Sequence, residues 1–145
     1  MRRPKYESHK DRAGQQEIAE AFGRHVGVQP TLAEGDMPRH DFEGKKDGKR
    51  VMFIEIRNRS NPMRRYPTYM VALHKHEYLC QMSERHGVPS YLVVRFADGK
   101  IGYWQIKRID QLLFQVNKGG RTDRNDDRDI EDCIFLPIEQ WQVIL

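Results

Sequence analysis

A carboxylate and a cation stand together in a strongly apolar stretch, residues 51–59. The stretch reads Val-Met-Phe-Ile-Glu-Ile-Arg-Asn-Arg, so Glu55 and Arg57 lie two positions apart. Because successive side chains of a strand alternate between its faces, these two should project from the same side. A carboxylate in an apolar strand costs free energy unless a cation or a bound metal ion compensates its charge. The stretch therefore predicts either an ion pair or a metal site.

A second carboxylate, Asp41, precedes this stretch by one expected hairpin. A strand is expected over residues 37–42, a basic turn over residues 44–49 and a second strand over residues 50–58. Within the turn, Asp47-Gly48 supplies the two positive φ values that tight hairpins favour. Adjacent hairpin strands can bring Asp41 and Glu55 together.

The elements around this hairpin follow from apolar spacing and from breaker residues. Helical spacing predicts a helix over residues 11–26 that stops at Gly27, followed by a loop over residues 27–36. After a breaker-rich loop over residues 60–67, Thr68 is expected to cap a buried helix that runs to about His86 and stops at Gly87. Strands over residues 90–96 and 101–106 should form a second hairpin around Asp98-Gly99.

The two ends of the chain and one late segment give weaker patterns. Residues 1–10 are expected to be a loose basic arm, and residues 109–114 a short helical turn. Residues 117–132 carry few apolar groups and many acids, which predicts a mobile charged loop. A short strand over residues 133–136 and a closing segment that packs Trp141 on the core complete a single expected domain, residues 1–145.

Positive charge is concentrated beside the carboxylates. The chain carries a net charge of +4 and has a pI near 9.1. Residues 43–65 alone hold eight basic residues against three acidic ones. Such a surface favours a polyanion, most naturally nucleic acid, as partner, although a solvated basic face is the simpler alternative.

Cysteine and histidine usage argues against other chemistries. Cys80 and Cys133 lie in apolar settings without paired spacing, which indicates buried free thiols in a reducing compartment. His74 and His76 would point about 200° apart on a helix, so they cannot chelate zinc together. No apolar run approaches the length of a membrane span or a signal core, so we expect a cytoplasmic protein without a membrane partner.

The order of these elements resembles that of the PD-(D/E)xK nuclease superfamily over most of residues 11–107. The chain looks most similar to small phage-type, Holliday-junction-resolvase-like members, in which an acidic-x-Lys strand leads through a Tyr-Pro loop to a helix and an apolar strand. The segments that carry the resemblance are Glu55-Ile56-Arg57-Asn58-Arg59, Tyr66-Pro67-Thr68-Tyr69, His74-Lys75 and Tyr91-Leu92-Val93-Val94-Arg95-Phe96. The resemblance implies an α/β fold with a restriction-endonuclease-like mixed sheet flanked by helices.

The resemblance also implies a Mg²⁺-dependent endodeoxyribonuclease. Asp41 and Glu55 would hold Mg²⁺ or Mn²⁺ together with the backbone carbonyl of Ile56, and Glu17 on the first helix would assist. Clustered carboxylates suit this role because a bound Mg²⁺ neutralises phosphate charge and activates water. Glu17 and its neighbour Glu20 can equally be solvated helix carboxylates.

The chain departs from the family pattern at Arg57, where the family has lysine. Arginine is always charged and cannot readily act as a base, although it can still bind phosphate. Lys75 on the following helix is a candidate replacement. The residues expected to contact nucleic acid are Lys45, Lys46, Lys49, Arg59, Arg64, Arg65 and Lys75.

Two alternatives to a nuclease stay open at this point. The first is a nuclease-like domain that has lost its chemistry and binds nucleic acid or a protein partner. The second is a basic adaptor in which Glu55 and Arg57 are only ion-paired. A homodimer is compatible with each, since the sequence does not define the oligomeric state.

Overall fold

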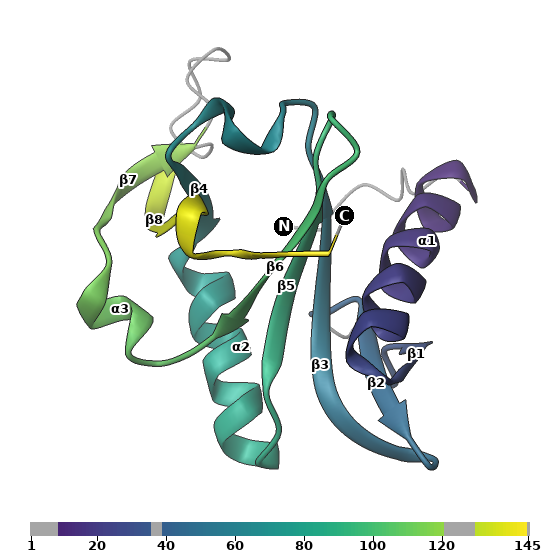
Figure 1. Cartoon of the computed structure of the whole chain (residues 1–145). Coiled ribbons are helices and arrows are strands. Elements are labelled where there is room, and N and C mark those ends of the chain that lie inside the picture. The colour runs from purple at the N-terminus through teal and green to yellow at the C-terminus, as the bar shows by residue number, and fades with distance from the viewer. Residues whose placement is uncertain (1–8, 36–38, 121–129, 145) are drawn as a thin grey trace.

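A six-stranded sheet forms the centre of the computed structural model, which describes residues 9–35, 39–120 and 130–144. Its strands, in spatial order, are β1 (Gln29–Leu32), β2 (Phe42–Lys46), β3 (Lys49–Asn58), β5 (Ser90–Arg95), β6 (Ile101–Ile106) and β9 (Gln142–Val143). Only β3 and β5 pair in parallel; the other neighbours are antiparallel. The expected mixed sheet is therefore present (Figure 1).

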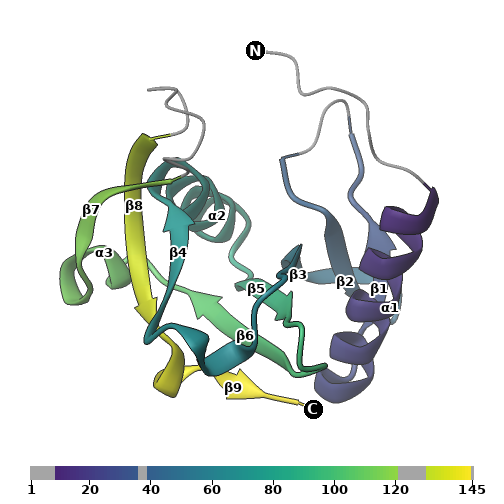
Figure 2. The ribbon, with the colours of Figure 1, turned by 90° about the horizontal axis from the view of Figure 1, so that it is seen from above.

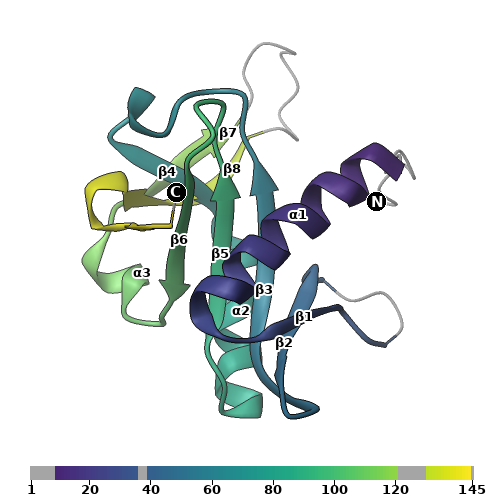
Figure 3. The same ribbon diagram turned by 45° about the vertical axis from the view of Figure 1, so that its right-hand side comes forward.

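Helices cover both faces of this sheet, as expected. The helix α1 (His9–Val26) crosses one face, and α2 (Leu73–His86) lies behind the other (Figure 3). Ile18 and Phe22 of α1 pack in one cluster with Ile54 and Ile56 of β3. Because strand side chains alternate, Glu55 points away from this cluster and toward α2. The alternation predicted for β3 is thus confirmed.

The tight turn between β2 and β3 has the predicted conformation. Asp47 has a φ of 52° and Gly48 a φ of 77°, the two positive values that suit Asp-Gly in a hairpin. Strand β2 ends at Lys46 and β3 begins at Lys49, so the turn is shorter than the expected range of residues 44–49. The strand expected over residues 37–42 is wrong over residues 39–41, which belong to no strand, since β2 begins only at Phe42; residues 36–38 lie outside the described residues. The prediction of a loop over residues 27–36 missed a strand, because β1 lies within that range and pairs with β2.

The predicted start of the second helix was wrong. Thr68 does not cap a helix; Thr68–Ala72 form strand β4, and α2 begins only at Leu73. The side chains of Tyr69 and Val71 are buried while their neighbours are partly exposed, which is the alternation of a strand. Pairing with β8 (Ile130–Pro137) decides the conformation, because it satisfies the backbone of this β-branched and aromatic segment.

A second sheet replaces part of the expected charged loop. It has the order β4-β8-β7, where β7 is Val116–Gly120 (Figure 2). Residues 117–120 and 130–132 are therefore paired strands; residues 121–129 lie outside the described residues. The polar composition of these residues suggested a loop, but exposed strands can carry polar side chains, and the side chains here are mostly exposed. Lys118 and Asp132 face each other across the two strands and form an ion pair of 2.9 Å. The expected loose arm also ends early, since residues 9 and 10 belong to α1, and residues 1–8 lie outside the described residues.

Short helical segments and the end of the chain complete the fold. These are η1 (Met63–Arg65), α3 (Asp110–Leu113) and η3 (Ile138–Gln140). Trp141 is buried among side chains of both sheets, as expected. Cys80 and Cys133 are buried free thiols, as predicted; the reducing compartment stays a prediction. No helix among the described residues is both long and apolar enough to cross a membrane.

Candidate functional site

Asp41 lies directly before β2 and is held against β3 by the backbone. Its N–H donates to the carbonyl of Ile54 at 3.2 Å. Its Oδ2 accepts the N–H of Ile56 at 2.8 Å. These two bonds fix the carboxylate beside the second half of β3. The hairpin therefore brings Asp41 next to Glu55, as its topology predicted.

Glu55 is the buried member of this cluster, with 1% of its surface exposed. Its Oε2 forms an ion pair with Arg57 and lies 3.6 Å from Nζ of Lys75. Its Oε1 is buried and has no hydrogen-bond partner among the described residues. Burial raises the pKa of Glu55 above its ordinary value, although Arg57 opposes that shift, and the nearby charge of Asp41 raises the pKa further.

Arg57 contacts three separate groups with one guanidinium. Nη1 donates to the carbonyl of Ile56 at 2.9 Å and lies 3.7 Å from Oδ2 of Asp41. Nη2 pairs with Glu55. The oxygen groups that were predicted to hold a metal are thus the groups that surround Arg57. We call Asp41, Glu55 and the Ile56 carbonyl the oxygen triad.

Lys75 reaches the same carboxylate from α2. Its ammonium donates to the backbone carbonyl of Arg39 and lies near Glu55. The side chain is only 18% exposed. Burial lowers the pKa of Lys75, while the charge of Glu55 raises it. Lys75 was predicted as a nucleic-acid contact and, as an alternative, as a replacement for the family's lysine at position 57; both roles stay predictions.

The oxygen triad fits a hard divalent cation. Mg²⁺ prefers oxygen ligands and keeps several water molecules, so two carboxylates and one carbonyl suffice from the protein. Among the described residues no group of three or more histidine, cysteine or acidic side chains could hold a metal. That finding agrees with the triad, whose third member is a backbone carbonyl. The buried Oε1 of Glu55 is an acceptor that a cation would satisfy.

The structure does not bring Glu17 to this cluster. Its Oε2 pairs with Nη1 of Arg95 at 3.2 Å, and its side chain is 69% exposed. Glu20 is exposed and accepts a hydrogen bond from Gln16 at 3.1 Å. Neither has a contact with the oxygen triad in the described part of the chain, so a role for Glu17 in metal binding stays a prediction.

The basic stretch is continuous in sequence but divided in space. Lys46 and Lys49 are exposed at the tip of the β2–β3 hairpin. Glu55 lies six positions after Lys49 along β3, which corresponds to about 20 Å of strand. Beside them, Lys45 pairs with Glu34 at 3.3 Å. The hairpin lysines therefore lie far from the oxygen triad.

The predicted arginines lie beyond the other end of β3. Arg64 and Arg65 are exposed on η1, in the loop that follows the strand. Arg59 stacks its guanidinium 4.7 Å from the ring centre of Tyr69 and donates to the Tyr69 hydroxyl at 2.8 Å. Arg59 is four positions from Glu55 along the chain, whereas Arg64 and Arg65 follow only in η1, after the end of β3.

A buried polar network around Glu43 and His40, next to Asp41 in the chain, was not predicted from the sequence. Glu43 is 1% exposed, and its two oxygens lie 3.2 Å from Nε2 of His40 and 3.1 Å from Nη1 of Arg50. Nδ1 of His40 lies 2.9 Å from the Tyr78 hydroxyl. Burial alone would raise the pKa of Glu43, but hydrogen bonds from the Glu34 N–H, His40 and Arg50 hold it below its ordinary value. No spacing in the sequence distinguishes Glu43 from a solvated carboxylate.

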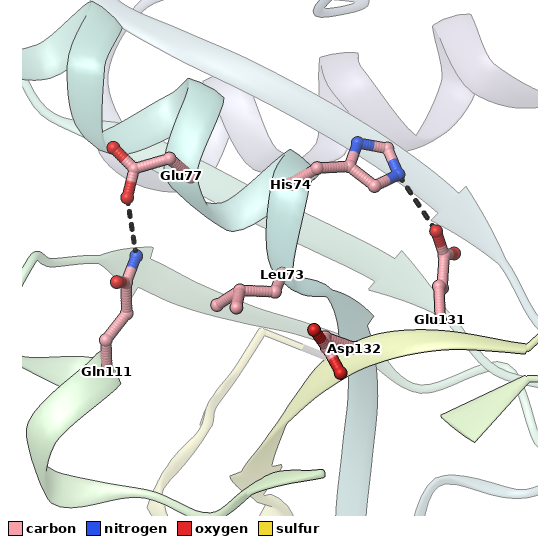
Figure 4. A pocket seen from close by; sticks show the side chains of 6 residues that line it. All are labelled: Leu73, His74, Glu77, Gln111, Glu131 and Asp132. Atoms are coloured by element: carbon pink, nitrogen blue, oxygen red, sulfur yellow. Dashed lines mark hydrogen bonds and ion pairs between the residues drawn. The ribbon is translucent and has the colours of Figure 1, made fainter. Parts of the chain in front are cut away.

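A surface pocket lies apart from the oxygen triad, where the start of α2 meets β8 and α3 (Figure 4). His74 pairs there with Glu131 at 3.2 Å, and Gln111 donates to Glu77 at 3.2 Å. The remaining lining residues are Leu73 and Asp132. This acidic lining disfavours a phosphate ligand. His74 lies in this pocket whereas His76 is buried against Asp110, so the two do not converge.

Two carboxylates on neighbouring segments, with a cation two positions after the second one, are the features that made the sequence resemble PD-(D/E)xK nucleases. The chain belongs to the family described as "Phage putative PDDEXK endonuclease", whose profile matches residues 1–144. The resemblance found in the sequence is thereby confirmed.

Comparison with individual proteins gives two further findings. Among solved structures, Hjc, a Holliday junction resolvase of the archaeal hyperthermophile Archaeoglobus fulgidus, superposes with a TM-score of 0.49 and 14% sequence identity. The match covers 87% of this chain and 86% of that one. A comparison with curated proteins yields no match.

Proposed function

We propose that this protein is a metal-dependent endonuclease that hydrolyses phosphodiester bonds in DNA. The observation that carries the proposal is the convergence of Asp41, Glu55 and the Ile56 carbonyl, with Arg57 and Lys75 beside them. Membership of a nuclease family supports it. The expected homodimer and cytoplasmic location stay predictions.

The oxygen triad would hold Mg²⁺ or Mn²⁺. A divalent ion bound there would neutralise charge on the phosphate and make a water molecule nucleophilic at neutral pH. Hydrolysis forms a bond from a water oxygen to phosphorus and breaks the bond from phosphorus to the leaving oxygen, and the proton that the water loses is balanced by the proton that the leaving oxygen gains. The contribution of the chain is to fix the triad, which the backbone bonds of Asp41 and the burial of Glu55 accomplish.

The two cations would have different tasks. Arg57 presents a planar fork that matches phosphate oxygens and keeps its charge at every working pH. Lys75 presents a compact ammonium whose position is fixed by the Arg39 carbonyl. We therefore assign phosphate binding to Arg57, and orientation of the attacking water with charge neutralisation to Lys75.

A domain that only binds nucleic acid or a protein partner is the second candidate. The observation that favours it is Arg57 itself, which replaces the lysine of the family pattern and already contacts all three members of the oxygen triad. In that case the cluster is an ion-pair network with a structural role.

Metal titration distinguishes the two candidates. The protein is freed of metal with a chelator and mixed in excess with end-labelled DNA, and Mg²⁺ is then added stepwise. A nuclease cuts only as Mg²⁺ rises, with saturation. A binding domain holds the DNA with or without chelator and leaves it intact at every Mg²⁺ concentration, which would refute the proposal. A labelled RNA of the same sequence tests the preference for DNA.

A further inference from the structure

One guanidinium lies among all the oxygen groups that would hold the metal. Arg57 contacts Ile56 O at 2.9 Å and Asp41 Oδ2 at 3.7 Å through Nη1, and Glu55 through Nη2. Lys75, by contrast, contacts one member of the oxygen triad in the described part of the chain, Glu55. Of these two cations, Arg57 is therefore the one whose position overlaps that of a metal ion.

A divalent ion and this guanidinium cannot share the oxygen triad. Both are cations, and at a separation of a few ångströms inside a protein their repulsion amounts to several kcal/mol. Both also compete for the Ile56 carbonyl and for the same two carboxylate groups. Metal binding therefore requires Arg57 to leave.

The surroundings of Arg57 allow it to leave, whereas Glu55 is fixed. The side chain of Arg57 is 31% exposed, so part of it already faces solvent, while the side chain of Glu55 is 2% exposed. Without a new partner the guanidinium would give up an ion pair with a buried carboxylate, which is costly. A DNA phosphate offers the guanidinium two charge-assisted hydrogen bonds in exchange.

Resting on the function proposed above, we propose that Arg57 occupies the metal position in the free protein and that a DNA phosphate draws it away, so that DNA and the divalent ion bind cooperatively. In the free protein the divalent ion then binds weakly. Because coupling between two ligands is reciprocal, DNA raises the affinity for metal by the same factor by which metal raises the affinity for DNA. The protein would thus assemble its metal site mainly on its substrate.

Calorimetric titration of Mg²⁺ into the metal-free protein tests whether Arg57 occupies the metal position in the free protein. Arg57→Ala should bind Mg²⁺ at least about fivefold more tightly than wild type, since coupling factors of this kind usually exceed that value. Lys75→Ala is the matched control, because it also removes one positive charge beside Glu55 but does not free the other two oxygen groups. Arg57→Gln, which keeps much of the volume, serves if the alanine variant does not fold.

Repeating the Mg²⁺ titration with a DNA duplex present tests whether DNA draws Arg57 away from the metal position. Glu55→Gln, which weakens the triad, gives the background of Mg²⁺ bound by the DNA itself. Wild type should gain affinity for Mg²⁺ from DNA above that background, and Arg57→Ala should gain less.

The outcomes separate this inference from the proposed function. If wild type and Arg57→Ala bind Mg²⁺ equally tightly and DNA changes neither, the exchange of Arg57 is refuted while the metal site stands. If no variant binds Mg²⁺ above the Glu55→Gln background, with or without DNA, both the metal site and the exchange are refuted.

Discussion

Two cations reach the same buried carboxylate from different elements. Arg57 comes from β3 itself, and Lys75 comes from the first turn of α2. In the family pattern the lysine stands on the strand, at the position of Arg57. In the function proposed above, Lys75 supplies the ammonium from α2 and Arg57 binds phosphate.

We expect Lys75→Ala to lower the single-turnover rate of DNA cleavage by about 10²- to 10³-fold, the usual effect of losing one charged group that stabilises the transition state. Arg57→Lys in the same chain should restore much of the loss, because it returns an ammonium to the oxygen triad. Lys118→Ala, a substitution at an exposed lysine of β7, should leave the rate unchanged. Full activity of Lys75→Ala would contradict the assignment, and so would failure of the double variant to recover.

The position of Lys75 depends on where α2 begins. Had the helix started at Thr68, as the sequence suggested, Lys75 would have lain two turns into it. Pairing of β4 with β8 moves the start to Leu73, and such pairing between residues far apart in sequence leaves no local signal.

In contrast, Asp41 and Glu55 could be placed together from sequence because one short hairpin links them. The position of Glu17 beside Arg95 could not be predicted, because an amphipathic helix does not show what its polar face will meet.

One buried aspartate ties α2 to the end of β6. Oδ2 of Asp110 lies 2.9 Å from Nε2 of His76, 3.0 Å from the Trp104 indole nitrogen and 2.9 Å from the backbone nitrogen of Lys107. Burial alone would raise the pKa of Asp110, but hydrogen bonds from His76, Lys107 and Trp104 hold it below its ordinary value. This junction keeps α2, and with it Lys75, in place behind the sheet.

Asp110→Asn should therefore destabilise the fold by about 2–4 kcal/mol at neutral pH. A carboxyl with a lowered pKa in the folded state contributes stability above its unfolded pKa and loses it as the pH falls through the folded value. The difference between wild type and variant should thus be largest above about pH 4 and shrink in stronger acid. Urea unfolding at a series of pH values measures it. Asp132→Asn, an exposed aspartate of β8, is the control and should change stability little; equal losses in the two variants would contradict this account.

Over the whole molecule, the basic residues form two groups that lie on either side of the oxygen triad along β3. Composition alone predicted one basic surface, because residues 43–65 are continuous in sequence. The strand separates the hairpin lysines from the arginines of η1, since its length places them toward opposite ends. A local charge count cannot reveal that separation.

Two matched double variants test which group binds DNA. Arg64→Ala with Arg65→Ala should weaken DNA binding and reduce the slope of log affinity against log salt by about 2, since each lost phosphate contact removes about one released counterion. Lys46→Ala with Lys49→Ala removes the same charge at the hairpin tip and should have a smaller effect. Fluorescence anisotropy at several salt concentrations gives both values. Equal effects would show that the two groups contribute alike.

Single-turnover cleavage of DNA by Glu55→Gln tests the central claim, that the oxygen triad is the active site. Glutamine keeps the shape of the side chain and removes the charge that a metal needs. The pKa of Glu55 is raised in the folded state, so the folded protein loses free energy of unfolding as the pH rises through that pKa and the carboxyl ionises. Glutamine does not ionise, so the variant should melt no lower than wild type at pH 7. We predict a folded protein that lacks Mg²⁺-dependent cleavage. A folded Glu55→Gln protein that cuts DNA at the wild-type rate would contradict the account.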